Sequence, residues 1–89
     1  MSIKIEFSDH SMLKIKTLKS HGIEFSKEMI EDIIRNPDKT DHGNQNRLIA
    51  QKEYDKEHIL RVVYERNLDN ILVITLYPAR RLRYEKNKI

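Results

Sequence analysis

Residues 59–84, ILRVVYERNLDNILVITLYPARRLRY, form the most apolar part of an otherwise polar chain. Two runs rich in β-branched residues, 59–66 and 71–77, are joined by the turn-prone link NLDN at 67–70. The stretch therefore predicts an antiparallel hairpin. Its second run is apolar at nearly every position, which indicates an interior strand covered on one face and partly on the other. Pro78 cannot donate a ladder hydrogen bond, so the strand is expected to end there.

The register of this hairpin decides which side chains share a face. A symmetric link places Val62 opposite Thr75 and Tyr64 opposite Val73. One face would then carry Leu60, Val62, Tyr64, Val73, Thr75 and Tyr77. The other would carry Arg61, Val63, Leu72, Ile74 and Leu76. A shift of one residue moves a whole set of side chains to the opposite face, so the pattern alone leaves open whether Arg61 and Thr75 share one.

The totals describe one small domain. We expect residues 1–89 to form a single domain with a short basic C-terminal tail. The absence of cysteine excludes disulfides and thiolate metal sites. No apolar run is long enough to cross a bilayer, and the N-terminus lacks the apolar segment of a signal peptide. A cytoplasmic protein without a membrane partner is therefore expected.

Upstream of the hairpin, the sequence predicts strands and two helices. Residues 3–7 alternate apolar and polar side chains, as a half-buried strand does. Helices are expected over 9–21 and within 26–36, each beginning after a serine suited to the N-cap. A strand is expected over 47–54, with an extra short one at 39–41. The predicted fold class is α+β, with two N-terminal helices packed on a mainly antiparallel sheet of four or five strands.

The first predicted helix has an apolar and a polar side. At about 100° per residue, Met12, Ile15 and Leu18 fall on one arc, which is expected to pack on the sheet. The opposite side carries His10, Lys14, Thr17 and His21. That polar side is either solvated or part of a site.

The four histidines form no recognisable metal site. His10 and His21 are too far apart along the predicted helix to share an ion, and the His-Glu-x-x-His pattern is absent. The chain has only two glycines, so it contains no glycine-rich phosphate loop. We therefore expect neither a metal nor a cofactor.

Basic residues cluster near the C-terminus, and the net charge is +3. Clustered cations favour a polyanionic partner such as RNA. RNA cleavage without a metal needs a base for the ribose 2′-hydroxyl, cations for the phosphate charge and an acid for the leaving oxygen. Histidine, arginine and tyrosine can fill these roles. The side chains that could supply them, with their neighbours, are His10, Lys14, Arg61, Thr75, Arg80, Arg81 and Tyr84.

Each candidate also has a structural explanation. Arg61 can pack its stem over apolar neighbours, Thr75 suits a strand, and His10 can lie on a solvated helix face. Taken singly, these three residues are better explained by structure than by catalysis, because residues outside a recognised motif seldom prove catalytic. The C-terminal arginines can equally form a solvated basic tail.

Several short patterns resemble those of known families. Residues 60–64 (LRVVY), 73–75 (VIT) and 80–84 (RRLRY) resemble the C-terminal half of RelE-like toxins. Residues 10–14 (HSMLK), 21–26 (HGIEFS) and 36–37 (NP) are similar to BrnT toxins and to a neighbouring uncharacterised family. That family begins with H-A-x-x-R-M-x-x-R-G-I and ends with V-x-T-x-Y. Together the patterns cover nearly the whole chain.

The resemblance implies a RelE/BrnT-like fold, an antitoxin encoded beside the gene, and RNA cleavage. Arg61, Arg81 (or Arg80) and Tyr84 match RelE-type active-site positions. His10 and Thr75 match the motif of the uncharacterised family. The resulting catalytic set is His10, Arg61, Thr75, Arg81 and Tyr84. The RNA-binding set is Lys14, Arg47, Arg80 and Arg83.

The leading hypothesis is the toxin of a type II toxin–antitoxin pair. It would be a metal-independent endoribonuclease acting on mRNA, including mRNA on the ribosome, with the cognate antitoxin as protein partner. The alternative is a non-catalytic module of the same fold that binds nucleic acid or protein through the same basic end. A further alternative is a homodimer formed through an exposed sheet edge.

Overall fold

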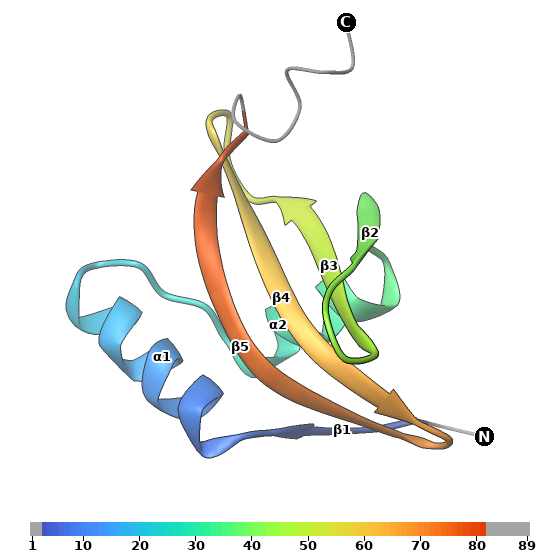
Figure 1. Cartoon of the computed structure of the whole chain (residues 1–89). Helices are drawn as coiled ribbons and strands as arrows, with labels where there is room; N and C mark the ends of the chain where they lie inside the picture. The colour runs from blue at the N-terminus through green and yellow to red at the C-terminus, as the bar shows by residue number, and fades with distance from the viewer. Residues whose placement is uncertain (1–2, 82–89) are drawn as a thin grey trace, which may run out of the picture.

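The predicted hairpin is the centre of the sheet in the computed structural model, which describes residues 3–81 (Figure 1). The strands are β1 (Lys4–Phe7), β2 (Lys39–His42), β3 (Arg47–Glu53), β4 (His58–Asn67) and β5 (Asn70–Arg80), and the helices are α1 (Asp9–Ser20) and α2 (Lys27–Arg35). The sheet order is β1-β5-β4-β3-β2. β1 runs parallel to β5, and the other neighbours are antiparallel. The α+β prediction, the short strand near residue 40 and the interior position of β5 are therefore confirmed.

The predicted register holds at one end of the hairpin and is wrong at the other. Tyr64 lies opposite Val73 as expected, but Val63, rather than Val62, lies opposite Thr75. The cause is a β-bulge, in which Ile74 is an extra residue on β5. Beyond the bulge every β5 side chain is displaced by one position relative to β4. Thr75 therefore lies on the same face of the sheet as Arg61. Arg61 is paired across the two strands with Tyr77.

The predicted end of the second strand at Pro78 is also wrong, because β5 continues to Arg80. Pro78 pairs with Leu60 of β4. β1 pairs only with residues 70–73 of β5, so within residues 3–81 no strand lies on the other side of Pro78. Proline is tolerated in such an edge segment, because one side of the backbone has no ladder to complete.

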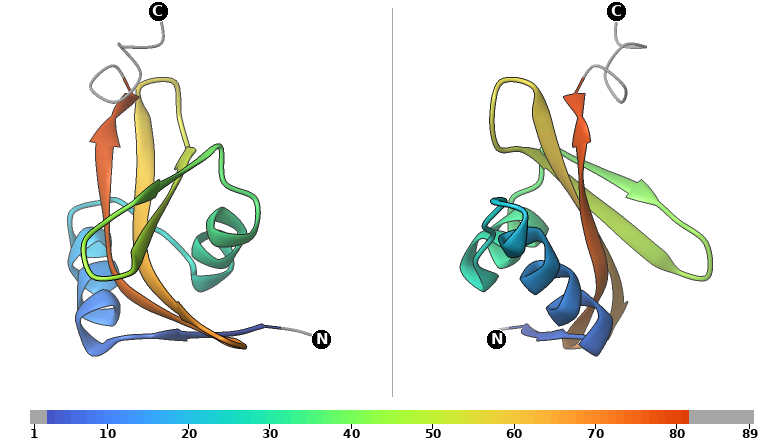
Figure 2. Two further views of the ribbon diagram at one scale, coloured as in Figure 1. Left: turned by 45° about the vertical axis from the view of Figure 1, so that its right-hand side comes forward. Right: turned by 90° about the vertical axis from the view of Figure 1, so that its left-hand side faces the viewer.

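Both helices cover one face of the sheet (Figure 2). The α2 stripe of Ile30, Ile33 and Ile34 is buried, in agreement with its helical spacing. Together with Leu18 and Phe25 it packs against the sheet residues of the core. These are Ala50, Leu60, Val62, Tyr64, Ile71, Val73 and Leu76. Hereafter the opposite face, which carries Arg61 and Thr75, is called the distal face.

The packing side of α1 differs from the predicted arc. Met12 is 41% exposed, whereas Ser11 is fully buried and Lys14 is half-buried. The buried side thus runs through Ser11, Ile15 and Leu18, because α1 lies against β5 near the edge of the sheet (Figure 1). The Ser11 hydroxyl is satisfied inside the protein, since it donates to the Ser8 carbonyl over 2.8 Å.

Ser8 joins α1 to the sheet as well as capping it. Its Oγ accepts from the Ser11 amide at 3.1 Å and donates to the Ile74 carbonyl at 2.9 Å. Ser26 caps α2 through the Met29 amide alone. We expect Ser26→Ala to lower the free energy of unfolding by about 1 kcal/mol and Ser8→Ala by about 2 kcal/mol. Urea denaturation measures both. Equal losses in the two variants would show that the Ser8–Ile74 bond contributes nothing.

Candidate functional site

The distal face brings together two residues that the sequence selected separately. The Nε2 atom of His10, at the start of α1, lies 3.1 Å from the Oγ1 atom of Thr75 on β5. His10 is exposed and Thr75 is half-buried. The bulge produces this contact, because it turns Thr75 toward the face that His10 reaches from the sheet edge. The pair is accessible to a ligand and is joined by a hydrogen bond.

Arg61 lies on the same face as a diagonal neighbour of Thr75. Its side chain is nearly buried, with 7% exposed. Nε donates to the Tyr77 hydroxyl at 3.0 Å, and one terminal nitrogen donates to the side-chain oxygen Oε1 of the buried Gln51. The other terminal nitrogen forms an ion pair with Asp41 at 3.2 Å. The predicted cation is thus held rigidly by protein acceptors.

Three members of this network were not selected from the sequence: Tyr77, Gln51 and Asp41. Tyr77 is the last residue of the V-x-T-x-Y pattern, so that pattern already contained the information needed to find it. Gln51 carries no sequence signal, because its role depends on its pairing with Arg61 across β3 and β4. Asp41 lies in a stretch of irregular composition, and only the formation of β2 brings it to Arg61.

The Tyr77 hydroxyl is a polar group that this network orients. It accepts a hydrogen bond from Arg61, and a phenol has one proton of its own to donate. Within residues 3–81, that proton has no acceptor. Tyr77 is half-buried and lies on the distal face beside Arg61. His10, Thr75 and Tyr77 thus provide three polar groups on the distal face, and the last of them contacts Arg61.

Arg81 lies farther along the sheet than the other described members of the catalytic set. It follows Tyr77 by four residues, a distance of about 13 Å along a strand. Its guanidinium forms an ion pair with Glu53 at 2.9 Å and donates to the Lys56 carbonyl at 3.3 Å. Arg81 is therefore separate from the His10–Thr75 pair. Tyr84 and Arg83 lie outside the described residues.

The remaining RNA-binding candidates do not form one patch. Lys14 is half-buried on α1, and Arg47 on β3 forms an ion pair with Glu65 at 3.3 Å. Arg80 is exposed, and within residues 3–81 it has no carboxylate partner. Its register partner on β4 is His58, on the helix-covered side of the sheet. Arg80 thus lies on the opposite face of the sheet from Arg61 and Thr75.

Two general features follow from the described part of the chain. No group of three or more His, Asp or Glu side chains within residues 3–81 is arranged to hold a metal ion. No helix in the same range is long and apolar enough to cross a membrane. Comparisons with protein-family models, with curated proteins and with solved structures find no match for this chain.

Proposed function

We propose that the protein is a metal-independent endoribonuclease that cleaves mRNA as the toxin of a toxin–antitoxin pair. The observation that carries the proposal is the hydrogen bond between His10 and Thr75 on the face that also bears Arg61 and Tyr77. An imidazole, two hydroxyls and a guanidinium are the groups needed to cleave a phosphodiester through the ribose 2′-hydroxyl. The distal face is the proposed active face.

In the proposed reaction, His10 removes the proton of the 2′-hydroxyl. The 2′-oxygen then attacks phosphorus, and the bond from phosphorus to the 5′-oxygen of the next nucleotide breaks. Tyr77 supplies the proton that this leaving oxygen takes up. The products are a 2′,3′-cyclic phosphate and a 5′-hydroxyl. His10 is left protonated and Tyr77 as a phenolate, and proton exchange with water restores both residues.

Two further residues act as positioning residues in this proposal. Thr75 orients the imidazole of His10 through their 3.1 Å contact. Arg61 holds the Tyr77 hydroxyl and contributes positive charge beside the phosphate. Arg81, directly after β5, is assigned to a neighbouring phosphate of the RNA, after release from Glu53. Tyr84 is the remaining residue of the proposed catalytic set, in which the resemblance to RelE-like toxins places it.

The α+β architecture is compatible with the proposed RelE/BrnT-like family. A toxin of this kind is encoded with an antitoxin, which is the protein partner we propose. β2 is a sheet edge within residues 3–81. An antitoxin strand pairing with that edge, or a second copy of the chain, is one way to complete it.

A second candidate is a non-catalytic module that binds nucleic acid or protein with the same face. It is favoured by the state of Arg61, whose guanidinium already donates to Tyr77, Gln51 and Asp41. An arginine held in this way stabilises a fold without any catalytic demand. The two candidates differ in RNA cleavage, because only the first is expected to cleave RNA.

Induced expression of the full chain in a bacterial host tests the proposal. We expect growth arrest together with mRNA cleavage. Tyr77→Phe removes one hydroxyl on the distal face and is expected to relieve both effects, whereas Tyr64→Phe, on the helix-covered face, retains them. Soluble, folded wild-type protein that leaves growth and RNA intact would contradict the ribonuclease and favour the binding module.

A further inference from the structure

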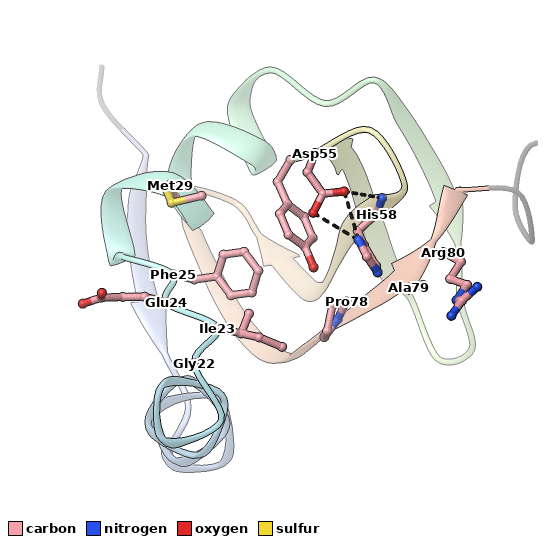
Figure 3. A pocket seen from close by; sticks show the side chains of 11 residues that line it. Gly22, Ile23, Glu24, Phe25, Met29, Asp55, His58, Pro78, Ala79 and Arg80 are labelled. Atoms are coloured by element: carbon pink, nitrogen blue, oxygen red, sulfur yellow. Dashed lines mark hydrogen bonds and ion pairs between the residues drawn. The ribbon is translucent and has the colours of Figure 1, made fainter.

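A pocket of about 550 Å³ lies on the helix-covered side of the sheet, away from the distal face (Figure 3). The α1–α2 connection forms one wall, and the ends of β4 and β5 form another. Its side chains include Ile23, Phe25, Tyr54, His58 and Arg80. The volume lies within the roughly 300–1,000 Å³ range typical of small-molecule sites. None of these residues takes part in the proposed cleavage reaction.

One part of the pocket is aromatic and fixed in place. The rings of Phe25 and Tyr54 meet edge to face with centroids 5.1 Å apart. Tyr54 stacks in turn on the His58 ring, at 5.8 Å and 24° between the ring planes. Phe25 is buried and belongs to the core. An aromatic wall anchored in the core suits a flat ring more than a flexible aliphatic chain.

The polar part of the pocket is a cross-strand pair. His58 and Arg80 lie directly opposite each other on β4 and β5, so their Cβ atoms are roughly 5 Å apart on the same face. Within residues 3–81, Arg80 has no ion-pair partner. Two carboxylates line the pocket, those of Glu24 and Asp55. Glu24 lies 3.6 Å from Lys19. Two nitrogen-bearing side chains from paired positions therefore line the same part of the pocket, where they can bind an anion.

Asp55 fixes the orientation of His58. Its Oδ1 lies 2.9 Å from Nδ1 of His58 (Figure 3). The same oxygen also accepts from the Glu57 and His58 amides. The hydrogen bond from the Glu57 backbone amide, followed by the interactions with His58, holds the pKa of Asp55 below its ordinary value. The carboxylate thus stays charged and keeps the proton on Nδ1. Nε2 of His58, which has no partner within residues 3–81, is left for a ligand, and a phosphate there takes the imidazolium form of the ring, in which both nitrogens donate.

We propose that this pocket binds a nucleotide, with the base against Phe25 and Tyr54 and the phosphate between His58 and Arg80. An aromatic wall next to two anion-binding nitrogens matches a flat base linked to a phosphate. A neutral aromatic ligand would leave Arg80 and His58 unused, and a bare anion would leave the aromatic wall unused. A nucleoside monophosphate and one nucleotide of RNA offer this same chemistry.

The test is a titration of the full-length, isotope-labelled chain with AMP, followed by NMR. We expect saturable shifts at residues 22–25, 54–58 and 78–80. Adenosine and inorganic phosphate should each bind at least about tenfold more weakly, since each supplies half of the contacts. Tighter binding of a four-nucleotide RNA than of AMP would identify RNA as the source of the nucleotide, and the reverse order would identify free nucleotides.

Two variants and one control make the test specific. Arg80→Gln and His58→Gln should each weaken AMP binding about tenfold. Arg66→Gln, an exposed arginine at the other end of β4, should leave it unchanged. Absent shifts, equal binding by Arg80→Gln and the wild type, or phosphate binding as strong as AMP would each overturn the proposal. None of these outcomes bears on RNA cleavage at the distal face.

Discussion

Arg61→Met is expected to lower the free energy of unfolding by about 3 kcal/mol. Methionine retains most of the apolar stem but removes every donor of the guanidinium. The side-chain oxygen Oε1 of Gln51, a residue only 3% exposed, then loses its partner inside the protein. Asp41 loses an ion pair and the Tyr77 hydroxyl loses a donor. The loss is thus expected to exceed that of a surface arginine several-fold.

Thermal unfolding measures this effect, because a domain of this size loses about 4–8 °C in Tm per kcal/mol. The expected decrease for Arg61→Met is about 12–24 °C. Arg66→Met is the matched control on the same strand, since Arg66 is exposed, and it should change Tm little. An Arg61→Met protein as stable as the wild type would show that the network of Tyr77, Gln51 and Asp41 does not stabilise the fold.

His10→Gln is expected to reduce RNA cleavage by at least about a hundredfold, because it removes the only base assigned to the 2′-hydroxyl. Glutamine can still contact Thr75, so the fold and the helix start are retained. His21→Gln, at the other end of the first helix, is the control and should cleave normally. Equal activity of the His10→Gln and wild-type proteins would remove His10 from the mechanism.

Thr75→Val separates positioning from catalysis. It keeps the β-branched shape of the residue and deletes the hydroxyl that contacts His10. A smaller loss than in His10→Gln is expected, together with an altered pH profile of cleavage, since the imidazole loses its orienting partner. A uniform loss at every pH would indicate a purely structural role for Thr75.

Most of the fold could be predicted because its causes are local. The serine caps before α1 and α2, the isoleucine stripe of α2 and the apolar β5 segment each give their element a distinct pattern. The bulge at Ile74 could not be predicted in this way. It depends on how Val63, Tyr64 and Thr75 fit against each other across two strands, and no local spacing encodes that fit.

The candidate site shows the same division. His10 and Thr75 were selected from short motifs, and the fold brings them into contact through the bulge. The network around Arg61 depends on pairings that span β2, β3, β4 and β5, so Asp41 and Gln51 had no local pattern to reveal them. The pocket at His58 and Arg80 was missed for the same reason, because its walls are distant in sequence.

The central claim is best tested by the ends of the RNA that the protein leaves behind. An mRNA is translated in a cell-free reaction with purified, full-length protein, and the product termini are identified by mass spectrometry. Cleavage at the distal face predicts 2′,3′-cyclic phosphates and 5′-hydroxyls with the wild-type protein and intact RNA with His10→Gln. Intact RNA with folded wild-type protein, or products carrying 5′-phosphates, would contradict the account.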